Sequence, residues 1–205
     1  MSQIIYQDLV IAGSWNTTVF SPKWLNENLW NLPLDTPIPT QLNFHNDRFV
    51  SKVYNLGNIK MDISDKKISF NIIKEDPEDF EKVLDWAKRI INLLPQTPIA
   101  EIGYNIKTIE EVLVKIPEIN FKGYTVDDYK DTYTFVKPDT TDQKLQPKII
   151  VTTTILENSI EFNINFGFKV SSLSESKQVL GAGSFILYQQ YSKEVISAML
   201  ERYHE

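Results

Sequence analysis

The stretch Ile68-Ser69-Phe70-Asn71-Ile72 recurs later in the chain as Ile160-Glu161-Phe162-Asn163-Ile164. In both copies apolar and polar residues alternate, which is the period of a β-strand with one buried face. Each copy comes after another alternating segment and a tight polar turn, and each precedes a helix-like segment. The repeat therefore predicts an internal duplication, in which two similar halves are each built from antiparallel strands and a helix. A match this short also arises by chance, and that alternative stays open.

Both copies belong to longer alternating segments. Residues 59–64 alternate in the same way before the first copy, and Asp65-Lys66-Lys67 turns the chain between the two. The second copy opens a run in which every second residue from Ile160 to Val170 is apolar. One apolar face and one polar face are typical of an antiparallel sheet that covers a core on one side.

Helices are predicted after each copy. Asp76 is a suitable N-cap and Pro77 suits the first helical turn, and apolar residues at helical spacing continue as far as Pro95. In the second half, Ser172 and Glu175 form a capping box for a short helix. A longer helix is predicted from Phe185 to about Tyr203, and a further short one over residues 109–116.

These patterns predict an α+β protein in which long helices pack on one face of one or two antiparallel sheets. We expect the 205 residues to form a single domain, 1–205. Its pseudo-repeat halves are predicted at 45–106 and 122–205, preceded by an N-terminal segment, 1–44. The pattern does not decide whether the two halves share one continuous sheet.

Composition restricts the classes of function. The chain has no cysteine, which excludes disulfides, thiolate metal sites and cysteine nucleophiles. The net charge of −6 and the scattered basic residues argue against a nucleic-acid partner. No apolar run approaches the roughly 20 residues of a membrane-spanning helix, and residues 1–8 lack the basic flank of a signal peptide. We therefore expect a soluble, cytoplasmic protein with no nucleic-acid or membrane partner.

No motif with the spacing of a catalytic, metal or phosphate site is present, so we predict no catalytic residue, metal or cofactor and favour a non-enzymatic role. The most site-like surface is formed by Asp127, Tyr129 and Asp131, which point the same way on a strand. His45 and Asp47 lie two residues apart and could form an acid–base pair. These five residues are the candidate ligand-binding residues. A solvated sheet face and an ordinary loop histidine are the alternatives.

Three of the four tryptophans, Trp15, Trp24 and Trp30, lie in the first thirty residues. Clustered aromatic residues mark either a protein interface or a core, and both interpretations stay open. As interface candidates, they support a non-enzymatic protein-interaction or accessory protein that binds another protein or itself. The alternative is a small-molecule or nucleotide-binding protein, or an enzyme, with a pocket between sheet and helices.

The stretch Pro98-Ile99-Ala100-Glu101-Ile102-Gly103-Tyr104-Asn105 follows an amphipathic segment and leads into a strand. It resembles the Pro-Ile … Ile-Gly-x-Arg-Tyr-x-Asn region of an uncharacterised, sporadically distributed bacterial family with two strand-plus-helix halves. Here Tyr104 directly follows Gly103 and the arginine is absent. The resemblance implies a bacterial accessory protein, and it carries over no catalytic residue.

Overall fold

The computed structural model describes residues 3–33, 36–111, 129–136, 146–156, 159–181 and 183–203. Its strands are β1 (Gln3–Gly13), β2 (Thr40–His45), β3 (Arg48–Leu56), β4 (Ile59–Ser64), β5 (Lys67–Ile72), β6 (Ile99–Glu111), β7 (Tyr129–Val136), β8 (Lys148–Leu156) and β9 (Ser159–Lys169). Its helices are α1 (Pro22–Leu25), the π-helix η1 (Asn26–Trp30), α2 (Pro77–Leu93), α3 (Leu173–Val179) and α4 (Ser184–Tyr203). The chain is therefore an α+β protein.

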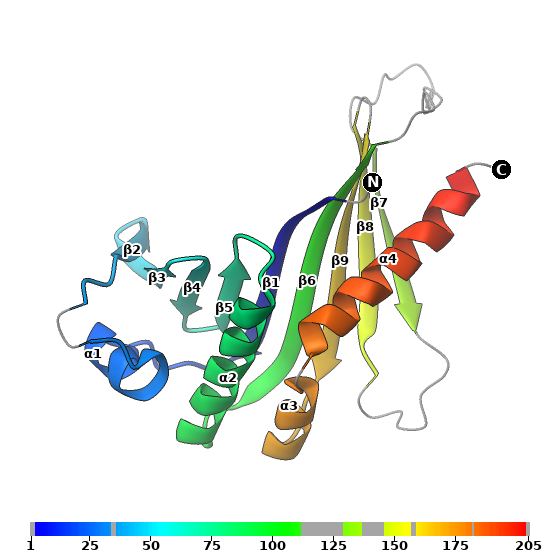
Figure 1. Ribbon diagram of the computed structural model, residues 1–205. Coiled ribbons are helices and arrows are strands. Elements are labelled where there is room, and N and C mark those ends of the chain that lie inside the picture. The colour runs from blue at the N-terminus through cyan, green and yellow to red at the C-terminus, as the bar shows by residue number, and fades with distance from the viewer. Residues whose placement is uncertain are drawn as a thin grey trace.

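The strands form one antiparallel sheet in the order β2-β3-β4-β5-β1-β6-β9-β8-β7. The long strands β1 and β6 pair at its centre, and helices α2, α3 and α4 lie on the same face (Figure 1). Strand β5 returns beside β1 and precedes α2, whereas β9 returns beside β6 and precedes α3 and α4. The two halves of the chain thus share one continuous sheet, a point that the sequence pattern left undecided.

A single row of paired residues crosses the whole sheet. Its members, from β2 to β7, are Thr40, Tyr54, Met61, Phe70, Leu9, Tyr104, Phe166, Ile149 and Phe135. The seven residues from Tyr54 to Ile149 in this row are all buried. Because side chains alternate along each strand, the row identifies the helix-covered face and explains the alternation seen in the sequence.

Aromatic rings join the helices to the centre of the sheet. Phe185, in the first turn of α4, stacks on Phe80 of α2 with ring centroids 5.0 Å apart. The same ring meets Tyr104 of β6 edge to face at 5.1 Å. The Tyr104 hydroxyl donates a hydrogen bond of 2.9 Å to the carbonyl oxygen of Val179. One tyrosine therefore contacts α4 and the end of α3 from the central strand.

The predicted helix starts are formed as the sequence indicates. The Asp76 side chain accepts a hydrogen bond from the backbone N–H of Glu78 at 2.9 Å. The Ser172 hydroxyl accepts one from the backbone N–H of Glu175 at 3.1 Å. Long helices are not confirmed as a general feature, since α1 and α3 have only four and seven residues. None of the described helices is long and apolar enough to cross a membrane.

One local prediction is wrong, and one element was not predicted. Residues 109–111, expected in a helix, continue strand β6, because Ile109 pairs with Gln3 on one side and with Glu161 on the other. The rest of that predicted helix lies outside the described residues. Residues 40–45, for which the sequence pattern predicted no element, form β2, which pairs along β3.

Candidate functional site

Strand β2 forms one edge of the sheet, since among the described strands only β3 pairs with it. Its six residues, Thr-Gln-Leu-Asn-Phe-His, include no proline, lysine, arginine or acidic residue. Edge strands of natural proteins usually carry charges, prolines or bulges that discourage pairing with another chain. A bulge interrupts the β2–β3 ladder between Asn43 and Phe44, but no charge or proline blocks the strand.

Large apolar side chains are exposed on the same hairpin. Phe44 is 61% exposed and Leu42 is 52% exposed, and on β3 both Phe49 and Val50 are exposed as well. The rings of Phe44 and Phe49 meet edge to face with centroids 6.1 Å apart. Exposed apolar side chains gathered on one element mark an interaction surface more often than single ones do. The four residues Leu42, Phe44, Phe49 and Val50 are called the hairpin patch below.

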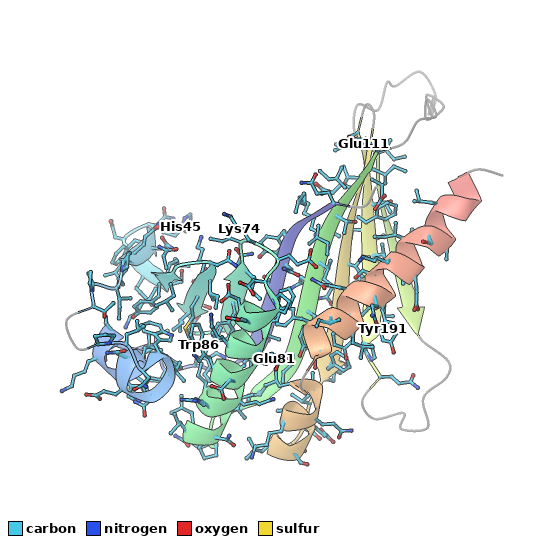
Figure 2. All side chains as sticks on the ribbon, in the orientation of Figure 1. His45, Lys74, Glu81, Trp86, Glu111 and Tyr191 are labelled. Atoms are coloured by element: carbon cyan, nitrogen blue, oxygen red, sulfur yellow. The ribbon has the colours of Figure 1, made fainter. Side chains whose placement is uncertain are left out.

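His45 and Asp47 lie at the tip of this hairpin, and Figure 2 shows His45 far from the end of the sheet that carries Glu111. Asn46 and Asp47 have φ values of 48° and 59°, which is the left-handed backbone of a two-residue type I′ turn. Asn and Asp tolerate this backbone better than most residues. The turn therefore accounts for Asp47, and ligand binding by the exposed pair stays a prediction.

A pocket of about 510 Å³ opens beside the start of β2. Four segments enclose it: η1, the β3–β4 turn, α2 and the connector between η1 and β2, which contains Pro33, Pro37 and Pro39. Its lining residues are Trp30, Leu32, Thr36, Pro37, Ile38, Pro39, Asn55, Leu56, Gly57, Ile59, Asp79, Lys82 and Trp86. This volume lies within the range of about 300–1,000 Å³ that is usual for ligand pockets.

Hydrogen bonds hold the two described ends of the connector, at Leu32 and at Pro39. Asn31 adopts a left-handed φ of 51° that ends η1. The Asn26 side chain then accepts a hydrogen bond from the N–H of Leu32 at 2.7 Å and donates one to its carbonyl oxygen at 3.0 Å. Further along, the carbonyl oxygen of Pro39 accepts from the N–H of Asn55 at 3.1 Å. Since Thr40 follows Pro39 directly, the wall of the pocket continues into the edge strand.

Two tryptophans form the aromatic part of the wall. The rings of Trp30 and Trp86 cross at 62° with centroids 6.4 Å apart, and Figure 2 labels Trp86 on the side of α2 toward η1. Trp30 also packs edge to face on Tyr54, whose hydroxyl donates to the carbonyl oxygen of Phe20 at 2.7 Å. These contacts fix the wall, so the pocket is largely preformed.

The charges lining the pocket neutralise each other. Burial alone would raise the pKa of Asp79, but hydrogen bonds from Lys82 and Asn58, both 2.8 Å long, outweigh it and lower that pKa. The hydrogen bond to Asp79 in turn raises the pKa of Lys82. Both groups therefore stay charged and paired at neutral pH. The pocket is consequently suited to an uncharged, apolar group.

The three N-terminal tryptophans differ in burial. Trp15 and Trp30 are buried, whereas Trp24 is half-buried and packs edge to face on Phe20 at 5.4 Å. This burial favours the core interpretation for Trp15 and Trp30, and an interface role for the three stays a prediction. Trp30 is one of the residues that line the pocket.

Two of the remaining predicted site residues, Tyr129 and Asp131, belong to the opposite edge of the sheet. Asp127 lies outside the described residues. Tyr129 and Asp131 belong to β7, the other edge strand, where their backbones pair with Ile155 and Thr153. The structure therefore does not bring His45 and Asp47 together with Tyr129 and Asp131.

Sequence reasoning missed both the edge position of β2 and the pocket. The prolines of the connector favour extended backbone, but they do not indicate which elements this backbone lies against. Among the described residues, no three histidine or acidic side chains are placed to hold a metal ion. Neither the family models nor the curated proteins searched give a match to this chain.

Proposed function

We propose that this protein is a non-enzymatic binding protein that adds an extended segment of another polypeptide to edge strand β2. The observation that carries the proposal is a pairing edge without charge or proline, next to four exposed apolar side chains. In this mode of recognition, main-chain hydrogen bonds give affinity and side-chain pockets give specificity.

The pocket supplies the specificity in this proposal. Its wall at Thr36–Pro39 leads directly into β2, so a strand paired with β2 ends beside the opening. An aliphatic or aromatic side chain of the bound segment fits there, because the two lining charges already pair with each other. A small apolar molecule is the second candidate occupant, favoured by the volume of about 510 Å³.

The test is a selection of displayed peptides against the protein and two matched variants. Leu42→Lys/Phe44→Lys places two charges on the edge strand, and Ile186→Lys/Leu187→Lys places two charges on exposed positions of α4. We expect alternating apolar peptides to bind the wild type and the α4 variant, with at least tenfold weaker binding to the edge variant.

Hydrogen exchange then locates the bound peptide. The amides of residues 40–45 should exchange more slowly in the complex, because pairing gives the outward-facing N–H groups new acceptors. Equal peptide binding by the edge variant, or unchanged exchange in β2, would contradict the proposal. A peptide-free protein whose β2 amides are protected in a concentration-dependent way would show that the bound polypeptide is a second copy.

We also infer that the two halves arose by duplication and that the protein has an accessory role in bacteria. The duplication is supported by the position of the repeated segments, since β5 flanks β1 and β9 flanks β6 in the same way. The accessory role rests on the resemblance at residues 98–105.

A further inference from the structure

The backbone groups of β2 point alternately toward β3 and toward the open edge, and one hydrogen bond shows which residues face the edge. The N–H of Asn55 donates to the carbonyl oxygen of Pro39 at 3.1 Å, so residue 39 faces β3. Hydrogen-bonded and non-hydrogen-bonded pairs alternate along an antiparallel ladder. The N–H and C=O groups of Thr40, Leu42 and Phe44 therefore point away from β3, toward the open edge.

The side chains of the same three residues share one face of the sheet. Thr40 pairs with Tyr54, which is buried on the helix-covered face. Leu42 and Phe44 follow at intervals of two residues and point to that face as well, where more than half of each side chain is exposed. The intervening side chains at positions 41 and 43 are uncharged amides. The edge of β2 thus alternates between apolar and uncharged polar residues.

We propose that β2 pairs antiparallel with β2 of a second copy of the chain, around a two-fold axis perpendicular to the sheet at Leu42. The inference rests on the proposed function, because it names the polypeptide that is added to the edge. In this register Leu42 lies opposite Leu42 of the second copy, and Thr40 of each copy lies opposite Phe44 of the other. The outward-facing backbone groups of both strands then bond to each other, and the two sheets become continuous.

The distribution of charge favours a second copy as the partner. The chain carries a net charge of −6, so two copies repel each other overall and associate best through uncharged surface. Two-fold pairing places each residue of β2 opposite itself or its symmetry-related neighbour. A charge at the centre of the strand would therefore meet a like charge, and β2 has none. A charged foreign segment, by contrast, would find no opposite charge on this strand.

The apolar side chains are complementary in the same register. The two Leu42 side chains meet at the axis, and Phe44 of the second copy comes to lie beside Thr40. Thr40 directly follows Pro39, which lines the pocket, so this ring lies next to the pocket wall. The contact is isologous and closes at two copies, because each copy uses its β2 edge once. Pairing also removes the exposed edge that favours aggregation.

The size of the contact sets its expected strength. It consists of one six-residue strand and the hairpin patch. A stable interface of standard size involves roughly 20–30 residues on each partner. We therefore expect a dimer that dissociates on dilution.

The first test uses the absence of cysteine from the chain, because a single introduced thiol then reports on a single position. The Cα atoms of a hydrogen-bonded antiparallel pair lie about 5.5 Å apart, within the roughly 4.4–6.8 Å that a disulfide spans. Leu42→Cys should therefore form a disulfide-linked dimer when oxidised with diamide. Ile186→Cys, at an exposed position of α4, measures random collision and should react at least tenfold more slowly.

Neighbouring positions test the register. Gln41 lies opposite Asn43 of the second copy, which places the two copies of residue 41 about 8 Å apart at Cα, too far for a disulfide. Gln41→Cys alone and Asn43→Cys alone should not cross-link, whereas a mixture of the two variants should. Cross-linking of either variant with itself in preference to Leu42→Cys would overturn the proposed register.

Sedimentation velocity from dilute to concentrated protein provides a readout without cysteine. The wild type and Ile186→Lys/Leu187→Lys should show a monomer–dimer equilibrium, and Leu42→Lys/Phe44→Lys should remain monomeric. A wild type that is monomeric throughout, or an edge variant that still dimerises, would overturn self-pairing. A monomeric wild type that binds alternating apolar peptides at β2 would overturn self-pairing alone and leave the proposed function intact.

Discussion

At the scale of single residues, the face of the sheet opposite the helices carries the carboxylate of Asp8, which is buried. Asp8 is 6% exposed and accepts hydrogen bonds from the Tyr6 hydroxyl and the Asn105 amide, both 2.6 Å long. Asn165 continues this chain with a bond of 2.6 Å to Asn105. Burial nevertheless raises the pKa of Asp8 above its ordinary value, and the two hydrogen bonds only reduce that effect.

This shift predicts how stability depends on pH. The folded carboxyl keeps its proton at pH values where the unfolded chain, with a pKa near 3.9, has lost it, so stability falls as pH rises through this window. Asp8→Asn should therefore raise the Tm at pH 7, with a gain that disappears toward pH 3. Thermal melts from pH 3 to 7 measure this gain in Tm. Asp65→Asn, at an exposed turn position, is the control. A lower Tm for Asp8→Asn at pH 7 would show that the hydrogen bonds outweigh the cost of burial.

At the scale of elements, the structure separates two explanations of the N-terminal tryptophans. Trp30, the last residue of η1, is 8% exposed and packs against Tyr54 of β3 and Trp86 of α2. Trp30→Ala should lower the free energy of unfolding by about 3–5 kcal/mol, as for other buried aromatic residues. Trp24→Ala should lower the free energy of unfolding by clearly less, because Trp24 is only half-buried. Urea denaturation measures both, and wild-type stability in Trp30→Ala would assign this residue to an interface instead.

Sequence reasoning succeeded for elements whose pattern is set by one buried face. Strands β4, β5 and β9 alternate because alternate side chains enter the core, and α2 carries its cap and its apolar stripe. It failed for β2, whose residues are mostly exposed and follow no burial pattern. It also failed for the end of β6, where pairing with β1 and β9 decides the conformation. The pocket depends on which segments become neighbours in the fold, and the pattern of a single segment does not predict that order.

At the scale of the whole molecule, the continuous sheet predicts a single cooperative unfolding transition. All four tryptophans lie between residues 15 and 86, so tryptophan fluorescence reports only the first half. Far-ultraviolet circular dichroism reports the strands and helices of both halves. The two urea midpoints should coincide, because β1 and β6 join the halves through the core. Separate midpoints would show that the halves unfold as independent units.

The central position of β1 has a consequence for the newly made chain. Strand β1 is synthesised first, yet its neighbour β6 begins only at Ile99. At roughly 5–20 residues per second, the ribosome needs a few seconds after finishing β5 before β6 is complete. During that interval β1 is itself an open strand edge, with Leu9 and Ile11 not yet covered from the side of β6. Nascent chains on crowded polysomes therefore face a period of mispairing that the finished protein no longer shows, and a chaperone that covers extended apolar strands would act there.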